Sequence, residues 1–410
     1  MPNLKEVIFS ITNRCNLRCR MCDIPCGKVE ELTTDQWKIV IRDASRLGAQ
    51  TVVFSGGEPL LREDIFELIS FTRKNNLNAC VTSNGHLINE QVARDLSISG
   101  VNVVNISVEG TRETHDYLRG SGSFDKAVTG LMNLRKYKIE STVASTVSKY
   151  NYRDLPYVLE VAKDCGATTV RLQPFNVIFL QNHKRKNEFL IDKREIKNVE
   201  DVIKVFIDTS REYKISINPT GYLLKIPVYL SGKNFYPNNC GALWYSCPIN
   251  PNGDLFPCWI EGANNKLIGN VAKESLYGLW LSEKRIKMVG SIVNNGCKGC
   301  LMSCYDEAFE RKLLKESVMD NAKKLKKITS YKKIMNKVLQ SSKSQITKLK
   351  LRYRFYVSYR GSLTKIIGRR LSSAFNKTGS LKQDKQAEEE IVLSEINQAK
   401  RKLKKEMRKL

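Results

Sequence analysis

VIFSITNRCNLRCRMC, residues Val7–Cys22, places three cysteines directly behind an apolar run that is predicted to form a β-strand. Cys15, Cys19 and Cys22 follow on a loop with the spacing C-x3-C-x2-C. Three thiolates this close together can bind three irons of a 4Fe-4S cluster and leave the fourth iron without a protein ligand. A zinc site is the alternative, because Cys26 could supply a fourth ligand.

A glycine-rich turn follows the next apolar run, in the sequence TVVFSGGEPLL. The pair Gly56 and Gly57 lets the backbone approach a ligand closely, and the Glu58 carboxylate can accept hydrogen bonds from an ammonium group. A plain strand-to-helix turn would also use two glycines, but it would not require the whole Gly-Gly-Glu-Pro sequence.

The two motifs resemble those of the radical S-adenosylmethionine (SAM) enzymes. In that family the free iron is chelated by the amino and carboxylate groups of SAM, so the resemblance implies reductive cleavage of SAM to methionine and a 5'-deoxyadenosyl radical. It implies that Gly56, Gly57 and Glu58 contact the amino group of SAM's methionine part. It also implies reduced flavodoxin or ferredoxin as the electron donor.

Other expected strand ends carry residues that resemble further SAM contacts of the family. NISVEGTRETHDYLRG contains Ser107 and Arg119, and the resemblance implies that both touch SAM, the arginine as a planar fork on the carboxylate. Glu109 stands where the family more often has aspartate, and it is the candidate for a proton-transfer role. The remaining contacts implied by the resemblance are Asn84 at the cavity mouth, Met21 on the adenine and the backbone near Leu172.

The apolar runs predict an α/β fold with a parallel sheet, because they alternate with helical patterns. The expected strands are residues 7–12, 51–55, 78–82, 103–108, 141–147 and 168–173. All the candidate residues above lie at the carboxyl ends of strands, where such sheets bind ligands. The resemblance implies a partial (β/α)6 TIM-like barrel. Cys80 and Cys165 have no ligand-like neighbours and are predicted to be buried structural thiols.

A second group of cysteines follows the expected barrel. PNGD between apolar flanks predicts a β-hairpin whose second strand ends at Cys258. The order of cysteine, hairpin, helix and cysteine run resembles the SPASM or shorter twitch domains, which hold auxiliary 4Fe-4S clusters. A disulfide set fits less well, because no signal peptide precedes the chain and the first cluster requires a reducing compartment. The group consists of Cys240, Cys247, Cys258, Cys297, Cys300 and Cys304.

The number of auxiliary clusters depends on which of these cysteines are ligands. Six cysteines favour one cluster over two, because the complete two-cluster SPASM pattern has seven or more. One version of the site uses Cys240, Cys258 and the first two cysteines of the final run, and the other adds Cys247 and takes one thiolate from that run. The versions differ over Cys247 and Cys304, and a zinc knuckle in the final run is a further alternative. A cluster closed by four thiolates can relay an electron, which favours a net oxidation.

The chain carries a net charge of +26, and nearly all of it lies in the last hundred residues. Residues 311–410 contain 29 Lys and Arg against 8 Asp and Glu, a net +21, which leaves +5 for the first 310 residues. Apolar residues at helical spacing predict basic amphipathic helices there. Such helices suit an anionic membrane surface, and no apolar run is long enough to span a bilayer. A solvated, partly disordered tail or a helix pair packed on the barrel is one alternative, and nucleic-acid binding is a less favoured one.

The 410 residues therefore divide into a radical SAM core (1–220), a SPASM/twitch domain (235–310) and a basic helical tail (311–410). We expect an enzyme that abstracts hydrogen from a substrate C–H bond and finishes by oxidation, epimerisation or bond formation, on a small-molecule, peptide, sugar or lipid-linked substrate. The tail favours a lipid-linked substrate, and the lack of a peptide-recognition domain before the first strand disfavours leader-carrying peptides. An iron–sulfur electron carrier or nucleic-acid-associated protein without SAM turnover is the alternative. The expected location is the cytoplasm, free or at the inner face of the membrane.

Overall fold

The computed structural model describes residues 4–26, 29–180, 183–232, 246–263, 266–295 and 300–302. By its internal contacts the chain divides into two compact units, Met1–Lys315 and Glu316–Leu410. All of the second unit lies outside the described residues, and so do the basic amphipathic helices expected in the tail.

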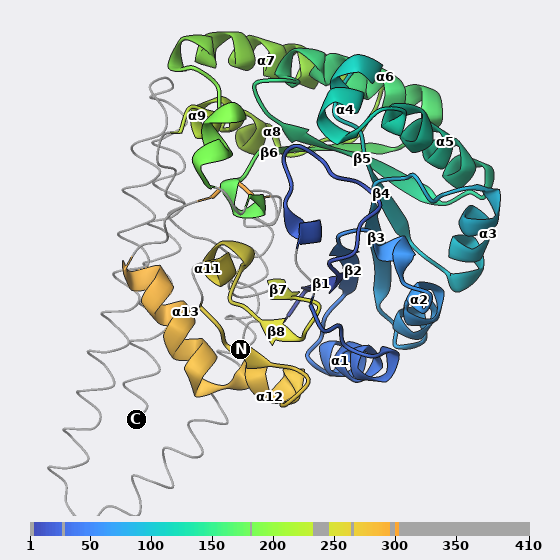
Figure 1. The fold of residues 1–410 in the computed structure, drawn as a ribbon, viewed down its shortest axis with the longest axis vertical. Coiled ribbons are helices and arrows are strands. Elements are labelled where there is room, and N and C mark those ends of the chain that lie inside the picture. Colours follow the sequence, from blue (N-terminus) through green and yellow to red (C-terminus); the bar gives the residue numbers. More distant parts are fainter. Residues whose placement is uncertain are drawn as a thin grey trace, which may run out of the picture. The chain divides into compact units, whose positions relative to one another are not determined.

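The first unit is built on a curved sheet with the strand order β6-β5-β4-β3-β2-β1-β7-β8-β9 (Figure 1). Strands β1 to β6 are parallel and pair in chain order. Each predicted strand is confirmed to within one residue at either end, and the α/β barrel class is confirmed with them. The bounds are Glu6–Thr12 (β1), Thr51–Gly56 (β2), Asn78–Ser83 (β3), Val103–Ser107 (β4), Glu140–Val147 (β5) and Thr169–Pro174 (β6).

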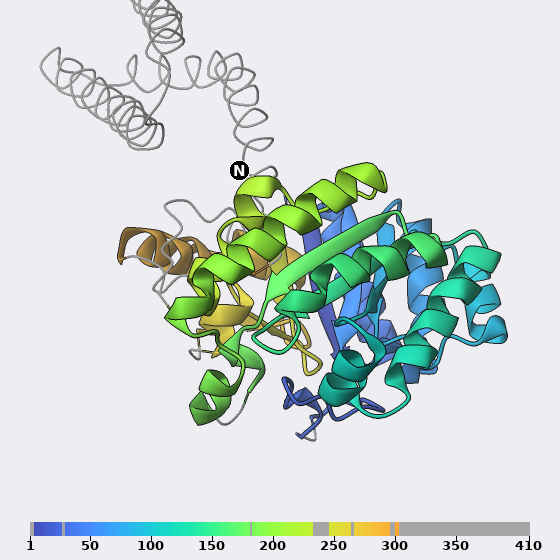
Figure 2. The same ribbon diagram turned by 90° about the horizontal axis from the view of Figure 1, so that it is seen from above.

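Helices cover the convex face of the sheet, so the concave face forms the interior of the partial barrel (Figure 2). Phe9 of β1 packs on Trp37 of α1, with 4.7 Å between ring centroids, and thus faces the helices. Because side chains alternate along a strand, Ser10 and Thr12 face the interior. The helices of the barrel are Thr34–Arg46 (α1), Ile65–Lys74 (α2), Glu90–Ser99 (α3), Arg112–Arg119 (α4), Ser123–Lys136 (α5), Leu155–Cys165 (α6) and Ile196–Glu212 (α7).

The predicted hairpin is confirmed, and it belongs to the same sheet. Strand β7 (Ser246–Ile249) runs parallel to β1, and β8 (Asp254–Leu255) returns antiparallel to β7, followed by β9 (Gly269–Asn270). Gly253 takes a φ of 90° in the turn, a conformation that favours glycine. The prediction that the second strand ends at Cys258 is wrong: β8 ends at Leu255, and Cys258 stands directly before the next helix.

Shorter elements complete the described part of the chain. Short 3-10 helices connect the barrel elements, and further α-helices precede and follow the hairpin in the chain. Their bounds are Ile24–Cys26 (η1), Pro59–Leu61 (η2), Tyr152–Asp154 (η3), Val177–Phe179 (η4), His183–Glu188 (η5), Lys193–Glu195 (η6), Thr220–Leu223 (α8), Ile226–Leu230 (α9), Trp259–Ala263 (α11), Leu276–Leu281 (α12) and Glu283–Asn295 (α13).

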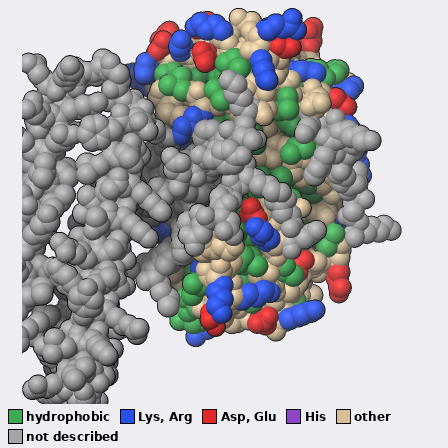
Figure 3. Space-filling view, turned by 90° about the vertical axis from the view of Figure 1, so that its left-hand side faces the viewer, with side chains coloured by type: hydrophobic (Ala, Val, Ile, Leu, Met, Phe, Trp, Pro, Cys, Tyr) green, Lys and Arg blue, Asp and Glu red, His purple; other side chains and the backbone are tan. Residues whose placement is uncertain are grey.

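The described surface is mixed in character. Figure 3 shows basic, acidic and hydrophobic side chains interspersed on one face, outside the part that grey atoms cover. Within the residues described, no helix combines the length and the apolar character needed to cross a bilayer.

Candidate active site

The cluster loop, residues 13–26, carries the three closely spaced cysteines directly behind β1. Cys15, Cys19 and Cys22 are partly buried free thiols, whereas the even-numbered residues between them, such as Arg18, are exposed. The Cys22 amide donates to the Cys19 carbonyl at 3.1 Å, so these two cysteines share a tight turn. The loop therefore turns its thiols inward and its arginines outward.

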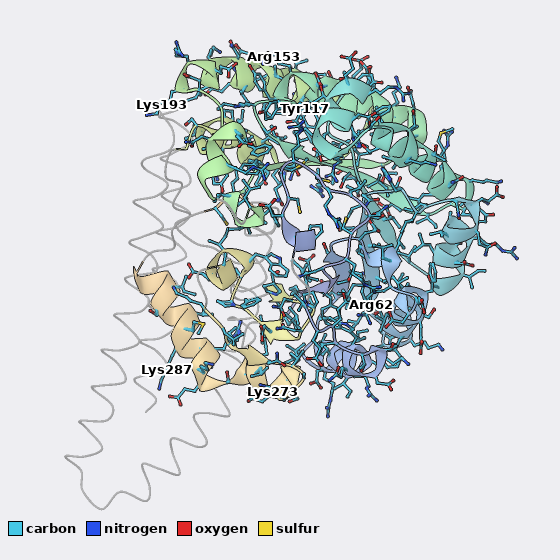
Figure 4. The ribbon with its side chains drawn as sticks, viewed as in Figure 1. Arg62, Tyr117, Arg153, Lys193, Lys273 and Lys287 are labelled. Carbon is cyan, nitrogen blue, oxygen red and sulfur yellow. The ribbon has the colours of Figure 1, made fainter. Side chains whose placement is uncertain are left out.

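The outer side of the cluster loop is fixed to α4. The amide of Arg20 donates to the carbonyl of Leu118 at 2.9 Å, and its Nε donates to the carbonyl of Tyr117 at 2.9 Å. The guanidinium also lies 4.1 Å from the centroid of the Tyr117 ring, which Figure 4 labels. These contacts hold the loop against the helix that ends at Arg119.

A buried arginine, Arg62, fixes the start of the loop (Figure 4). Its guanidinium donates to the carbonyls of Ile11 and Leu32 at 3.1 and 3.2 Å and pairs with Asp64 at 2.7 Å. It also pairs with Glu31 at 3.3 Å, a carboxylate that accepts the Thr12 hydroxyl. The end of β1 and the segment after the cluster loop therefore both contact the Arg62 guanidinium.

The two glycines of the Gly-Gly-Glu-Pro sequence lie where no side chain would fit. A Cβ on Gly56 would stand 2.3 Å from the carbonyl oxygen of Thr12, and a Cβ on Gly57 would stand 2.2 Å from that of Arg14. Both distances are far below van der Waals contact. The glycines let the end of β2 pack directly against the start of the cluster loop, where the Gly57 and Glu58 amides donate to those same two carbonyls.

Glu58 is fully buried beneath the cluster loop. Its carboxylate accepts from the Ser83 hydroxyl at 2.9 Å, the Asn84 amide at 2.8 Å and the Leu60 amide at 3.2 Å. Burial raises the pKa of Glu58 to about 7, although these donors act in the opposite direction. A cationic ligand beside the carboxylate would lower that pKa and be bound by it.

Arg119 and Glu109 form an ion pair at the opposite side of the cluster loop. The Nε of Arg119 donates to the Glu109 carboxylate at 2.8 Å, and its Nη1 lies 3.9 Å from the Cys19 sulfur. Burial alone would lower the pKa of Arg119, but the charge of Glu109 and the nearby Cys19 raise it above its ordinary value. The guanidinium therefore stays charged beside the cysteines.

Glu109 is itself held from several sides, although it lies two residues beyond the end of β4. Its second carboxylate oxygen accepts from the Thr146 amide at 2.7 Å and the Ser145 hydroxyl at 3.3 Å. Its own amide donates to Nδ1 of His115 at 3.1 Å. These contacts give Glu109 a positioning role toward Arg119, and its proton-transfer role stays a prediction.

Asn84 links the carboxylate to the first cysteine. Its backbone amide binds Glu58, and its side-chain Nδ2 donates to Asn16 at 2.8 Å and lies 3.9 Å from the Cys15 sulfur. Arg119 and Asn84 thus direct N–H groups at two of the three sulfurs. Such donors stabilise thiolates and cluster sulfur, so the loop fits an iron–sulfur cluster.

Burial and a nearby cation act in opposite directions on the pKa values of the three thiols. Burial raises the pKa of Cys15 and Cys19, and it raises that of Cys22 to about 11, while Arg119 acts to lower all three. In the part of the chain that the structure describes, no three His, Cys, Asp or Glu side chains form a group that could hold one metal ion. The thiols of a 4Fe-4S site each bind a different iron, so they need not lie close enough together to share one metal ion.

The other predicted SAM contacts lie around the same interior. Ser107 is the last residue of β4, and its hydroxyl has no hydrogen-bond partner among the described residues. Met21 and Leu172 are buried in the core. The Leu172 amide donates to the Asn218 side chain at 2.7 Å, which leaves its carbonyl as the backbone group for a ligand. No observation tests these assignments, so they stay predictions.

The second cysteine group is described only in part, because Cys240, Cys297 and Cys304 lie outside the described residues. Cys247 is fully buried on β7; burial raises the pKa of its thiol, and the charge of Arg285 on α13 partly opposes this. Cys258 packs against Val289 and Ile292 of the same helix. Cys300 is buried; burial raises the pKa of Tyr229 on α9, and the charge of a Cys300 thiolate would raise it further.

Two family models match the chain. A radical SAM superfamily model matches residues 9–162, and an iron–sulfur cluster-binding domain model, SPASM, matches residues 240–305. An AdoMet-dependent heme synthase of Oleidesulfovibrio alaskensis is 31% identical over 276 residues, which cover 63% of this chain and 70% of that protein. The chain belongs to the radical SAM superfamily.

Other radical SAM relatives differ in their named products. The mycofactocin maturase of Mycobacterium tuberculosis is 29% identical over 272 residues, 65% of this chain and 67% of that protein. The Fe-coproporphyrin III synthase of Methanosarcina barkeri is 36% identical over 162 residues, and the match spans only 41% of that protein.

Solved structures share the fold. SuiB of Streptococcus suis bound to precursor peptide SuiA matches with a TM-score of 0.57 and 17% identity, over 72% of this chain and 67% of that one. The enzyme anSMEcpe with bound AdoMet matches with a TM-score of 0.57 and 20% identity, over 71% and 83% of the two chains. The cofactors of this radical SAM enzyme are a 4Fe-4S cluster, SAM and auxiliary iron–sulfur centres. The auxiliary domain matches SPASM, and nothing supports twitch.

Several residues of the radical SAM site escape sequence reasoning. Arg62, His115 and Asn151 are buried and support the cluster loop or Glu109, Asn151 by donating to the Glu109 carbonyl at 2.8 Å. Arg62 and Asn151 lie outside the quoted motifs, and His115 lies within the stretch quoted for Ser107 and Arg119 without being singled out there. The only sequence signal is that Arg62 closely follows the Gly-Gly-Glu-Pro sequence.

Proposed function

We propose that this radical SAM enzyme removes hydrogen from a C–H bond of its substrate and that an auxiliary cluster accepts an electron, giving a net oxidation. The observation that carries the proposal is the placement of two charged groups against the cluster loop. Glu58 is buried with its amide donating to the Arg14 carbonyl, and the Arg119 guanidinium lies 3.9 Å from the Cys19 sulfur. Both belong to the predicted SAM set, as does Ser107 at the end of β4.

When bound, the cluster and SAM supply a 5'-deoxyadenosyl radical that takes a hydrogen atom from the substrate. The chain's own residues would bind SAM and orient it. Glu58 would accept the ammonium of SAM, and Arg119 would pair with its carboxylate while Glu109 fixes the plane of the guanidinium. The glycines keep the end of β2 against the start of the cluster loop, and Arg119 lies 3.9 Å from the Cys19 sulfur of the same loop.

The auxiliary site is proposed to include Cys247. Both Cys247 and Cys258 lie along α13, the first near Arg285 and the second on Val289. A full set of thiolates at this site would favour electron relay over substrate binding. Cys240 and one cysteine of the final run would complete the set.

The substrate is proposed to be a small molecule or a peptide. One class follows from the heme synthases, whose product is a tetrapyrrole, and another from SuiB, which binds a precursor peptide. Reduced flavodoxin or ferredoxin is the proposed electron donor. A membrane role of the tail, a lipid-linked substrate and a cytoplasmic location at the inner face of the membrane stay proposals that rest on the charge of residues 311–410.

Anaerobic reconstitution tests the proposal. The purified full chain, loaded with iron and sulfide and reduced with dithionite, is expected to convert SAM to methionine and 5'-deoxyadenosine, measured by chromatography. A variant with Cys15, Cys19 and Cys22 all changed to Ser is expected to lose that product entirely. If the loaded wild-type protein forms no 5'-deoxyadenosine under conditions in which a related enzyme is active, the radical function is wrong.

A further inference from the structure

A cavity of about 250 Å³ lies where the barrel interior meets the β7–β8 hairpin. Its walls come from β1 and the cluster loop, from η4, and from the hairpin with α11. The described lining residues on which the argument rests are Ser10, Asn13, Phe179, Asn250, Phe256 and Trp259.

The cavity borders the proposed SAM site directly. Ser10 faces the interior next to Gly56, with its Oγ 3.1 Å from the position of a Cβ on that glycine. Asn13 stands two residues before Cys15, and its carbonyl oxygen lies 2.8 Å from the position of a Cβ on Gly57. A group in the cavity would therefore lie beside the cluster loop.

An aromatic wall forms the far side of the cavity. The rings of Phe256 and Trp259 stand 6.4 Å apart at 47°, and Gly262 of α11 makes room for the Phe256 ring, which would lie 2.8 Å from a Cβ there. Phe179 of η4 adds a third ring, and its carbonyl accepts the amide of Asp23 at 2.8 Å. Three separate segments thus bring aromatic rings to one small space.

The polar groups of the cavity are neutral and partly unpaired. Among its described lining residues none is charged. Asn250 is used in the hairpin turn, where its Oδ1 accepts the Asp254 amide at 2.8 Å. The Ser10 hydroxyl, the Asn13 amide and the Trp259 indole N–H make no hydrogen bond among the residues described. These three groups can bind a neutral polar substituent.

We propose that the cavity holds an uncharged aromatic side chain of a peptide substrate, placing it next to SAM; this rests on the proposed function. The aromatic wall stacks on the ring, and the neutral polar groups bind a phenol or backbone amide. A tetrapyrrole fits poorly, because its carboxylates would be desolvated without a cation. The volume also lies below the roughly 300–1,000 Å³ of sites for drug-sized ligands.

Ligand-observed NMR on the reconstituted full chain with SAM tests the proposal. The probes are N-acetyl-tyrosinamide, its glutamate counterpart and coproporphyrin III. The tyrosine probe is expected to bind, the glutamate probe is not, and coproporphyrin III is not expected to displace the tyrosine probe. Trp259→Ala is expected to weaken binding of the tyrosine probe about tenfold, because a stacking ring and its buried area are lost.

Two further variants separate recognition from folding. Trp259→Phe keeps the ring and loses the indole N–H, so its affinity is expected to fall between those of wild type and Trp259→Ala. Tyr277→Ala removes a ring that is 43% exposed on α12 and is expected to change nothing. Iron content of each variant reports whether the domain is intact.

The proposal is overturned if the tyrosine probe does not bind at about 10 mM, binds Trp259→Ala as tightly as wild type, or is displaced by coproporphyrin III. Formation of 5'-deoxyadenosine from SAM and dithionite without added substrate is measured in parallel. Its absence would refute the proposed function, whereas its presence with no tyrosine binding would refute only the substrate class.

Discussion

Arg119 is the residue whose geometry most constrains ligand binding. Its guanidinium is oriented by Glu109 and charged beside Cys19. A carboxylate ligand would therefore bind to a pair of N–H donors that is already held in place. Arg119→Lys keeps the charge and loses the fork, and we expect SAM to bind about 10- to 100-fold more weakly, since a charged hydrogen bond contributes about 1.5–3 kcal/mol. Equilibrium dialysis with the reconstituted protein measures this.

The matched control lies on the same helix. Arg112 is exposed and pairs with Asp125, so Arg112→Lys should leave SAM affinity unchanged. Equal losses in the two variants would mean that Arg119 acts on the stability of α4 and not on SAM.

His115 should make the fold sensitive to acid. Burial lowers its pKa to about 3, helped by Arg119, while the unfolded side chain titrates near 6.5. Between these values only the unfolded chain binds the proton, so the stabilisation is complete above pH 6.5 and is lost as pH falls toward 3. His115→Asn keeps an acceptor for the Glu109 amide and removes the titration.

Thermal unfolding checks the effect of His115. From about pH 7.5 to about pH 5.5, the wild-type melting temperature should fall more steeply than that of His115→Asn. Parallel curves for the two proteins would show that His115 is protonated without cost in the native state.

Sequence predicts individual residues only where a motif fixes the spacing. Cys15, Gly56 and Glu58 were identifiable because each stands in a short run at a strand end. Arg62 and His115 were not, because their importance comes from burial and from partners 20 or more residues away or on another element. Those contacts exist only after the chain has folded.

At the scale of elements, the contact between the end of β2 and the cluster loop is the most sensitive to change. Gly57→Ala would force a methyl group within 2.2 Å of the Arg14 carbonyl, so strand and loop must separate. We expect the variant to lose the iron of one cluster, about four atoms per chain, with the auxiliary centre retained. Iron and sulfide analysis after reconstitution measures it.

Gly290 provides the comparison for that substitution. It lies within α13, and nothing stands within 4 Å of a Cβ built there. Gly290→Ala should keep all the iron and raise stability by about 0.5–1 kcal/mol. Full iron retention in Gly57→Ala would contradict the proposed role of the close approach.

The strands of the barrel were predictable because each contains a short apolar run that alternates with a helical pattern along the chain. The pairing of β7 with β1 was not, since Val7 and Cys247 are 240 residues apart and no local pattern records their register. The same holds for the cavity, whose walls come from β1, η4 and α11. The aromatic and uncharged lining of this cavity could therefore be identified only from the structure.

At the scale of the whole molecule, the two cysteine groups sit in one compact unit, Met1–Lys315. The sheet runs without a break from the strands of the barrel into the hairpin that carries Cys247. The proposed radical site and the proposed electron acceptor are thereby parts of one packed unit, which suits the proposed sequence of hydrogen removal and oxidation.

The iron content of the full chain decides whether the six later cysteines hold one auxiliary cluster or two. A variant with Cys15, Cys19 and Cys22 changed to Ser removes the SAM-binding cluster only, and we expect it to retain about four irons per chain, against about eight in wild type.

Cys80→Ser and Cys165→Ser are the matched controls and should keep all the iron. Both controls stand in barrel elements outside the two cysteine groups, Cys80 within β3 and Cys165 as the last residue of α6. Cys165 is buried, whereas Cys80 is only partly buried. Eight irons in the triple variant would mean that the six later cysteines hold two clusters, at least one of them with an open iron, and the closed electron relay proposed here would then be wrong.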